Sequence, residues 1–387
     1  MGICVTKSQN HIVSGSHVDI QAPNPTPPIP PKEEQKAPTE ALRKKYTRPK
    51  QKLVSIPTDG PETEQEIVPV FGRKLHLEGT PSTQAQSGFE DKKVKIVTEN
   101  FSLELLGKAG IGYACKKGLK PESPNQDDFC IVLDNDTILL GVFDGHGPCG
   151  HHVSAFVHTD MTRLILDSPD LHIAPTTAIR SAFIATNERL KDYCRESKGD
   201  CDCSISGTTA SIALIQGRKM YIAHVGDSRV VLGRKTPASF ETVELTIDHK
   251  PTLPEEQKRI EANGGEVKKL PFDIPYRVFV YGTEDPGLSM SRSIGDTVSQ
   301  NVGVTCEPEL REVDLEGDQG SFVLMCSDGV WEFIKNEEAV DLVSKFSRAT
   351  ARQGAEKLAQ LAWMRWLHNE EEVVDDITVV VSFVPKV

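Results

Sequence analysis

The sequence predicts an α+β fold in which two β-sheets form the core and helices cover the outside. Three observations lead to this prediction. Hydrophobic residues make up 38% of the chain, which is enough for a sizeable core. The predicted strands come in clusters and the predicted helices in pairs, rather than in the regular alternation typical of a parallel sheet. No internal repeat is present in the chain.

The chain divides near residue 89 into two parts of different composition. Residues 1–88 contain 12 of the 25 prolines and few large apolar side chains, so they cannot bury enough surface to offset the entropy of ordering. We predict a disordered tail over 1–88 and one large domain over 89–387. The tail carries a net charge of +2 and the domain −14. An acidic domain disfavours nucleic acid as a partner and suits a protein that gathers carboxylates around cations.

In the first half of the domain, an apolar run predicts a strand over Thr137–Phe143, directly before the residues DGHG. Apolar residues three and four positions apart predict helices over His151–Asp167 and Thr177–Glu196. Three strands are then predicted over Gly207–Gln216, Lys219–Val225 and Arg229–Arg234, with a hairpin turn at Gly217 and Arg218 between the first two.

In the second half, a proline at one end and two glycines at the other predict a short helix from Pro254 to Gly264–Gly265. Residues 266–287 mix prolines and glycines with other residues and predict a long surface loop. The remaining predicted elements are a strand over Ser321–Cys326, helices over Asn336–Phe346 and Thr350–Leu367, and a strand over Ile377–Val384.

Acidic residues recur where the predicted strands end. Strand ends project from the rim of a two-sheet sandwich, so these carboxylates are expected to converge in one cleft. A single aspartate in such a place, for example Asp296, is interpreted as a turn residue, but five or six in one domain indicate a site. The set comprises Asp127, Asp128, Asp144, Asp227, Asp296, Asp328, Asp375 and Asp376.

Carboxylates in one cleft repel one another unless cations neutralise them. Hard oxygen ligands favour Mg²⁺ or Mn²⁺ over zinc, and the carbonyl of Gly145 is a further candidate ligand because glycine permits a tight turn. Two such ions about 3.5–4 Å apart form a clamp for displacement at phosphorus. The chain lacks the motifs of P-loop enzymes, protein kinases, cysteine phosphatases and GxSxG hydrolases.

Seven motifs resemble, in order and spacing, those of the metal-dependent protein phosphatases of type 2C. They are NQDDF, VFDGHG, SGTTA, HVGDSR, LSMSRSIGD, SDGVWE and DDITVVV. The resemblance covers residues 89–387, and the segment RVFVYGTEDPGLSMSRSIGD is similar to plant or protozoan members. It implies a four-layer α/β/β/α sandwich of two antiparallel sheets flanked by helices, and a monomer.

The resemblance also implies a site that hydrolyses phosphoserine and phosphothreonine in proteins. A hydroxide bridging two Mn²⁺ or Mg²⁺ ions would attack phosphorus, with no phosphoenzyme, while His146 acts as general acid. Asp144 would bridge both ions, and a third, weaker ion is implied at Asp227, Asp328 and Glu332. The remaining ligands of the two ions would be Asp127, Asp328, Asp375 and the Gly145 carbonyl.

The sequence departs from the family pattern at four positions. Lys120 is the only cation near the place where animal members carry an arginine that holds the phosphate, and lysine would bind phosphate as a point charge. Gln126 replaces a frequent glutamate, and Glu332 a usual aspartate. Asp376 replaces a usual asparagine, so either Asp375 or Asp376 is a candidate ligand.

Two other functions remain open at this point. The first is a catalytically silent scaffold that recruits partners through its proline-rich tail, and the second is a phosphatase of small metabolites. The intact Asp127, Asp144, Asp328 and Asp375 favour an active enzyme over the scaffold. The long segment 266–287 favours a protein substrate, since such loops shape docking surfaces.

The first residues, MGICVTK, predict lipidation. Gly2 with Thr6 fits the N-myristoylation pattern, and Cys4 is a candidate for palmitoylation. One myristoyl chain gives only marginal membrane binding, so a second signal is needed. We therefore expect the protein on the cytoplasmic side of a membrane, the plasma membrane being favoured, with a cytosolic pool.

Two further segments of the tail suggest partners. A basic run is a candidate for binding anionic lipid, although a solvated linker explains it equally well. PPIPP at 27–31 fits an SH3-type partner or a stiff spacer. The basic run consists of Arg43, Lys44, Lys45, Arg48, Lys50 and Lys52.

The nine cysteines are dispersed, which predicts reduced thiols in a cytosolic compartment. Cys201 and Cys203, with Cys194 nearby, raise the alternative of a zinc site. Their spacing does not match a CxxC knuckle and no second pair follows, so we interpret them as ordinary loop cysteines.

Overall fold

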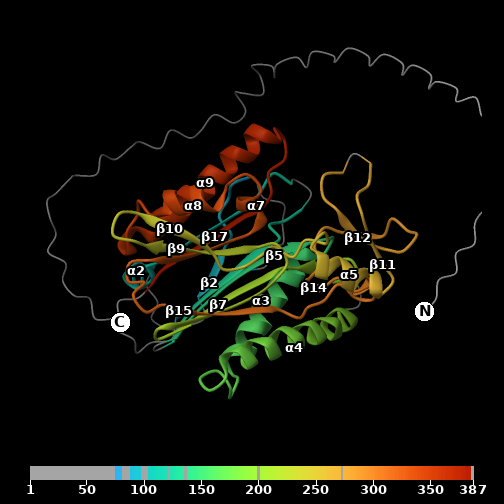
Figure 1. Cartoon of the computed structure of the whole chain (residues 1–387), viewed down its shortest axis with the longest axis horizontal. Helices are drawn as coiled ribbons and strands as arrows, with labels where there is room; N and C mark the ends of the chain where they lie inside the picture. The colour runs from blue at the N-terminus through green and yellow to red at the C-terminus, as the bar shows by residue number, and fades with distance from the viewer. Residues whose placement is uncertain are drawn as a thin grey trace, which may run out of the picture. The chain divides into compact units, whose positions relative to one another are not determined.

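Two antiparallel β-sheets lie at the centre of the computed structural model, and helices cover their outer faces (Figure 1). This arrangement confirms the predicted α+β sandwich. The residues that the structure describes are 75–80, 88–96, 103–120, 123–134, 137–197, 201–271 and 273–384. The lipidation sites, the PPIPP segment and the basic run all lie outside these ranges.

The larger sheet follows the order β15-β8-β7-β5-β4-β1-β2, and β6 joins β5 to β14. Its strands are β15 (Glu309–Asp314), β8 (Lys219–Val225), β7 (Ala210–Gln216), β5 (Thr137–His146), β4 (Asp127–Asp134), β1 (Leu75–Gly79), β2 (Val94–Ile96), β6 (Gly207–Thr208) and β14 (Ile294–Gly295). The predicted hairpin turn at Gly217 and Arg218 is confirmed, because Gln216 and Lys219 are paired across β7 and β8.

The second sheet follows the order β10-β9-β16-β17-β3. Its strands are β10 (Phe240–Glu244), β9 (Arg229–Lys235), β16 (Phe322–Cys326), β17 (Ile377–Phe383) and β3 (Ile111–Lys116). The predicted strands that end at Cys326 and begin at Ile377 are thus neighbours at the centre of this sheet.

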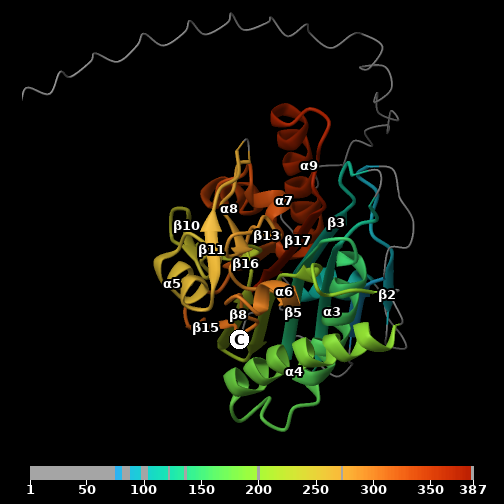
Figure 2. The ribbon, with the colours of Figure 1, turned by 90° about the vertical axis from the view of Figure 1, so that its right-hand side faces the viewer.

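Helices pack on the outer face of each sheet. Figure 2 shows α3 (Gly150–Leu166) and α4 (Pro175–Glu196) against the larger sheet, and α8 (Asn336–Val343) and α9 (Ala351–Asn369) on the opposite side. These four helices match the predicted ones to within a few residues. Shorter helices are α2 (Leu103–Ala109), α7 (Asp328–Trp331) and η1 (Arg348–Thr350). Within the described residues, no helix is long and apolar enough to cross a membrane.

Alternation along the strands explains why the core has layers. On β5, Ile138, Leu140 and Val142 face the space between the two sheets. Leu139 and Phe143, on the other face of the same strand, pack against the α3–α4 pair. A strand buried on both faces therefore reads as a continuous apolar run, which is how the sequence presented it.

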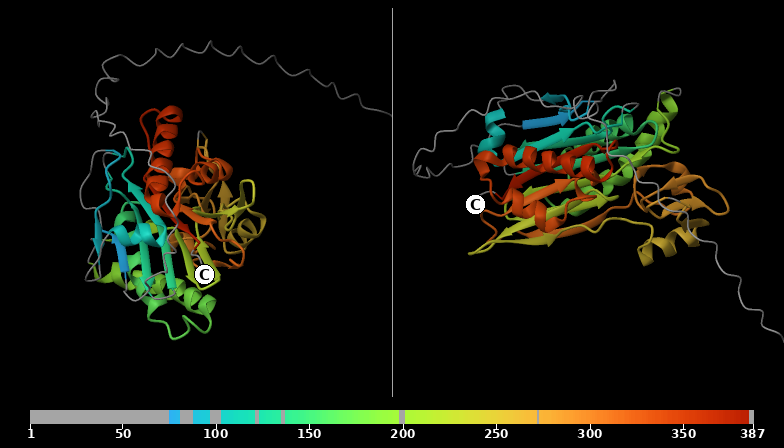
Figure 3. Two further views of the ribbon diagram at one scale, coloured as in Figure 1. Left: turned by 90° about the vertical axis from the view of Figure 1, so that its left-hand side faces the viewer. Right: turned by 90° about the horizontal axis from the view of Figure 1, so that it is seen from above.

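The predicted loop over 266–287 is wrong, because this region contains a small antiparallel sheet. Figure 3 shows it at one end of the two large sheets. Ile260, Val278 and Leu288 belong to an apolar cluster of its own, which explains its stability without contact with the main core. The elements are α5 (Pro254–Ala262), β11 (Gly265–Lys268), β12 (Arg277–Val280), β13 (Pro286–Leu288) and α6 (Thr297–Gln300).

The ordered domain begins before the predicted boundary at residue 89. Strand β1 lies between β2 and β4 in the larger sheet, and its Leu75 and Leu77 side chains are buried in the core between the sheets. Only two large apolar residues of this strand face that core, in a stretch of otherwise polar and proline-rich sequence. This signal is too short to separate from a tail by composition.

Candidate active site

The first two carboxylates are placed by the pairing of β4 with β5. Asp127 begins β4 and lies directly opposite Asp144 near the end of β5. Opposed residues of an antiparallel pair project to the same face, so the two side chains leave the sheet together. Backbone bonds fix Asp144 further, since its carbonyl accepts from the Thr209 amide and its amide donates to the Thr209 hydroxyl, both at 2.9 Å.

Asp127 is a buried carboxylate, 1% exposed, held by two hydroxyl groups. Ser327 and Thr378 each donate to its Oδ2 at 2.7 Å, and both belong to the second sheet's central strands or their ends. Burial and the charge of Asp376 raise the pKa of Asp127 to about 7 in spite of these bonds. The ionised form of Asp127 is therefore disfavoured unless a positive group lies nearby.

Three more carboxylates reach the same place from other strand ends. Asp328 follows β16, Asp375 precedes β17 and Asp227 follows β8. Burial, followed by the charges of Asp328, Asp127, Asp375 and Asp227, raises the pKa of Asp144 well above its usual range. Burial and the charges of Asp375 and Asp227 do the same for Asp328. The structure thus brings together the five aspartates that the sequence singled out as metal ligands.

Divalent cations fit this donor set. The groups are hard oxygen ligands that repel one another, and one buried oxygen, Oδ1 of Asp227, has no hydrogen-bond partner among the described residues. Gly145 follows Asp144 at a place where the surrounding backbone leaves no space for a side chain. A Cβ at this position would stand 2.4 Å from the carbonyl oxygen of Gly150 and 2.6 Å from that of Gln126.

The structure distinguishes Asp375 from its neighbour Asp376. Asp376 is 3% exposed and committed to the protein, because it accepts from the Gly118 amide at 2.7 Å and the Gln126 amide at 2.8 Å. Its Oδ1 also lies 3.3 Å from the buried ammonium of Lys117. Asp375 is only partly buried and its charge acts on Asp144 and Asp328, so it is the one of the two that could serve as a metal ligand.

Lys120 lies beside this cluster and forms an ion pair with Asp375. Burial opposes its charge, but Asp375, Asp376 and Asp144 raise its pKa, so it stays an ammonium at neutral pH. Glu332 does not join the cluster in the same way. It is exposed just after α7, and no hydrogen bond or ion pair connects its carboxylate to the described residues.

The exchange at Gln126 has a structural reason. Its side-chain amide donates to the Gly147 carbonyl at 2.8 Å, within the DGHG turn. An ionised glutamate accepts but cannot donate, so it could not make this bond. The turn that carries the Gly145 carbonyl is therefore held by the glutamine itself.

His146 has a partner that sequence reasoning missed. Its Nε2 lies 2.7 Å from Oδ2 of Asp296, a residue interpreted from sequence as a turn aspartate. Asp296 does occupy a left-handed turn, with φ of 48°, but its side chain is buried and also accepts from the Ser293 hydroxyl at 2.6 Å. Burial disfavours the imidazolium, but Asp296 outweighs this and raises the pKa of His146. Nδ1 of His146 has no partner among the described residues and is left as the atom that can donate a proton.

Asp128 points away from the site, contrary to the expected convergence. As the next residue on β4 it faces the opposite side of the sheet, where its Oδ2 lies 3.2 Å from Lys92 and 3.3 Å from Nδ1 of His158. Lys92 also donates to the carbonyl of Asp127. This buried ion pair holds the backbone of the site from the opposite face of β4. Because its two residues are far apart in the sequence, no local pattern predicted the pair.

The cysteines near the chain's 149–203 region remain free thiols. Sγ of Cys194 and Sγ of Cys201 lie 3.4 Å apart, and burial raises the pKa of each to about 11. Among the described residues, these thiols do not form a group of three or more ligand atoms close enough to hold a metal ion.

Comparison with known proteins identifies the family to which the chain is similar. The family model for protein phosphatase 2C matches residues 122–368. Probable protein phosphatase 2C 35 of Arabidopsis thaliana is 33% identical over 297 residues, which cover 70% of this chain and 82% of that protein. Probable protein phosphatase 2C 34 of the same plant is 36% identical over 281 residues, covering 67% and 76%.

A solved structure shows the same fold. The serine-threonine phosphatase 2C from Toxoplasma gondii has a TM-score of 0.62 and 20% sequence identity, covering 80% of this chain and 98% of that one. The matched family is one of metal-dependent protein phosphatases, and the carboxylate-lined rim fits that class. The chain belongs to the protein phosphatase 2C family and, by enzyme class, is a protein-serine/threonine phosphatase.

The assignment of Asp375 can be tested against Asp376. Asp375→Asn is expected to weaken Mn²⁺ binding by about tenfold or more while the metal-free protein keeps its melting temperature. Asp376→Asn should instead destabilise the fold by about 3 kcal/mol, because Lys117 loses its buried partner. Mn²⁺ titration and thermal unfolding without metal measure the two effects, and the reverse pattern would make Asp376 the ligand.

The contact between His146 and Asp296 predicts a pH effect. Asp296 raises the pKa of His146, so Asp296→Asn lowers it and the acid is lost at a lower pH. The alkaline limb of kcat against pH should therefore move to lower pH in the variant. Asp341→Asn, at an exposed ion pair on α8, serves as the control and should leave the profile unchanged. An unaltered profile in Asp296→Asn would refute the coupling.

Proposed function

We propose that this protein hydrolyses phosphoserine and phosphothreonine in proteins at the carboxylate rim described above. The observation that carries the proposal is the convergence of five aspartates from five separate strand ends beside the His146–Asp296 pair. Like charges gathered in this way repel one another, and a positive group bound among them relieves that repulsion. The family's general dependence on Mn²⁺ or Mg²⁺ supports the same cations here.

The residues divide between two strong cation positions and one weaker one. Asp144 would contact both of the strong positions, and Asp227, Asp328 and Glu332 would hold the weaker ion. When bound, two such ions lower the pKa of water and neutralise phosphoryl oxygens, which prepares in-line attack on phosphorus. The other ligands of the strong positions would be Asp127, Asp328, Asp375 and the Gly145 carbonyl.

The chain's own residues then handle the proton and the phosphate. His146, charged through its contact with Asp296, would give the proton at Nδ1 to the leaving seryl or threonyl oxygen. Lys120 would attract the phosphate as a point charge beside Asp375. No side chain needs to attack phosphorus, so no phosphoenzyme is required.

The small sheet supports a protein rather than a metabolite as the substrate. Ile274, Tyr276 and Tyr281, in and around this sheet, are 75%, 49% and 76% exposed. Exposed aromatic and aliphatic side chains offer contacts to a polypeptide that a small phosphate ester would not need. The silent scaffold is disfavoured because every ligand residue needed for the two strong cation positions is present.

The proposed activity is tested with a phosphothreonine peptide and the purified full-length chain. Turnover should require Mn²⁺, stop with EDTA and return when Mn²⁺ is added again. Asp144→Asn should reduce kcat by about 100-fold or more, because one group contacts both strong positions. Turnover that is insensitive to EDTA, or full activity in Asp144→Asn, would contradict the proposed site.

We further propose that the N-terminus anchors the enzyme to the cytoplasmic face of a membrane. Gly2 and Cys4 supply the two lipid signals, and the basic run near residues 43–52 adds attraction to anionic lipid. These residues lie outside the described part of the chain, so the support comes from the sequence pattern alone.

The Arabidopsis relatives also agree with a plant or protozoan type of enzyme.

Myristoylation at Gly2 predicts where the protein is found after fractionation. Gly2→Ala should move most of the protein from the membrane pellet to the soluble fraction. Stable anchoring needs two lipid signals, and this variant lacks the myristoyl chain. Gly15→Ala, in the same tail, is the matched control and should stay in the pellet. If Gly2→Ala also stays in the pellet, myristate is not the anchor.

A further inference from the structure

Asp227 uses its two oxygens in different ways. It follows β8, it is 2% exposed, and its Oδ2 accepts from the ammonium of Lys250 at 2.5 Å. Its Oδ1 is buried without a hydrogen-bond partner in the described part of the chain, while its charge raises the pKa of both Asp144 and Asp328. One oxygen is thus taken by a cation of the protein itself, and the other is left for the cluster.

The backbone around Lys250 is pinned to the backbone around Asp227. Asp248 forms two bonds of 2.8 Å with the guanidinium of Arg229. The amide of His249 donates to the Gly226 carbonyl at 2.9 Å, and Nδ1 of His249 accepts from the Gly226 amide at 3.2 Å. Contacts on both sides of Asp227 therefore hold Lys250 beside it, at a high effective concentration.

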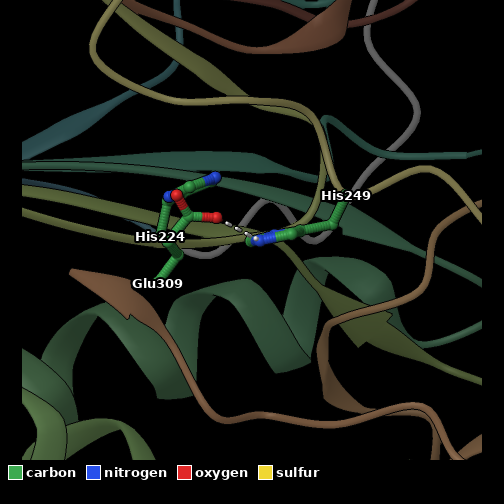
Figure 4. Close-up of side chains that lie close together, drawn as sticks. All are labelled: His224, His249 and Glu309. Atoms are coloured by element: carbon green, nitrogen blue, oxygen red, sulfur yellow. Dashed lines mark ion pairs between the residues drawn. The ribbon is translucent and has the colours of Figure 1, made fainter. Parts of the chain in front are cut away.

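His249 of this segment lies beside His224 and Glu309 (Figure 4). His224 stacks on His249 with ring centroids 4.3 Å apart, and Oε2 of Glu309 lies 3.5 Å from Nε2 of His249. Ligand atoms of the three residues all lie within 4.8 Å of one another, which is close enough to suggest a metal site. Because Nδ1 of His249 accepts from Gly226, however, its Nε2 carries the proton and faces Glu309 as a donor. In this tautomer Nε2 of His249 offers no lone pair to a metal ion, so we assign no metal site to the trio.

Lys250 also faces the second carboxylate of the weaker cation position. Although burial opposes its charge, Asp227 and then Asp328 raise its pKa. Glu332, the third group assigned there, is exposed; its backbone amide donates to the Asp328 carbonyl at 2.9 Å, but no hydrogen bond or ion pair connects its carboxylate to the described residues. The position therefore contains one carboxylate paired with an ammonium group, that of Asp227, and a second, that of Asp328, whose charge acts on the same ammonium.

We propose that Lys250 is a tethered cation that competes with the third metal ion for Asp227 and thereby keeps that position weak. The inference rests on the proposed function, which places the third ion at Asp227, Asp328 and Glu332. An ammonium and a divalent ion on one carboxylate repel each other, so each weakens the binding of the other even though Lys250 holds Oδ2 and leaves Oδ1 free. The side chain of Lys250 is 43% exposed, which gives it solvent into which it can move.

Equilibrium binding of Mn²⁺ to the full-length protein tests this competition. Free Mn²⁺ is measured by electron paramagnetic resonance during titration with MnCl₂. Lys250→Met should tighten the weakest class of ions by about tenfold, because the competing charge is gone. Lys250→Arg keeps the charge and should show no tightening. Lys345→Met removes an exposed lysine–aspartate pair on α8 and should bind Mn²⁺ as the unaltered protein does.

Two results would overturn the proposal. Unchanged or weaker binding in Lys250→Met would mean that the ammonium orients Asp227 for the ion instead of competing with it. Equal tightening in Lys250→Arg would mean that charge is not the cause. Thermal unfolding without metal checks the fold, and Lys250→Gln takes the place of Lys250→Met, with the same expectation, if the latter is not folded. Failure of the proposed function looks different, because the unaltered protein would then bind Mn²⁺ and show no turnover of the phosphothreonine peptide.

Discussion

Repulsion among carboxylates at one rim of the sandwich is the constraint on which the rest of the site depends. Asp328, Asp127, Asp375 and Asp227 raise the pKa of Asp144, Asp375 and Asp227 raise that of Asp328, and Asp127 and Asp227 are buried. Left to themselves, such groups would be protonated or pushed apart. The fold must therefore hold them close with forces that do not depend on the cations that bind there.

Most of that holding is done by strand pairing and by buried hydrogen bonds. The register of β4 and β5 places Asp127 opposite Asp144, and hydroxyl groups from the second sheet reach across to Asp127. Lysines complete the arrangement, with Lys120 on Asp375 and Lys250 on Asp227. Ammonium groups therefore lie at the edges of the cluster. Among the described residues, none lies between the carboxylates at its centre.

The sequence predicted the parts of this arrangement that are local. Apolar runs bordered by aspartate indicated the strand ends at which Asp127, Asp144, Asp227, Asp328 and Asp375 lie. Contacts between distant segments were not predictable in the same way. The roles of Asp296 and Lys92 depend on partners 150 and 35 residues away, and a turn or a surface lysine explains each equally well from local pattern. The small sheet was missed because its strands are short and carry prolines and glycines, which are signals of loops.

Strand β1 determines where the chain can be shortened and how a force on the N-terminus would reach the domain. Because β1 is bonded to β2 on one side and to β4 on the other, a truncated chain beginning at Phe89 would lose an interior strand and leave the edge of β4 unpaired. Such a chain would be prone to aggregate for reasons unrelated to its active site. If the proposed lipid anchor holds the N-terminus, a force on that anchor would reach the sheet that positions Asp127 through the backbone hydrogen bonds of β1 with β2 and β4.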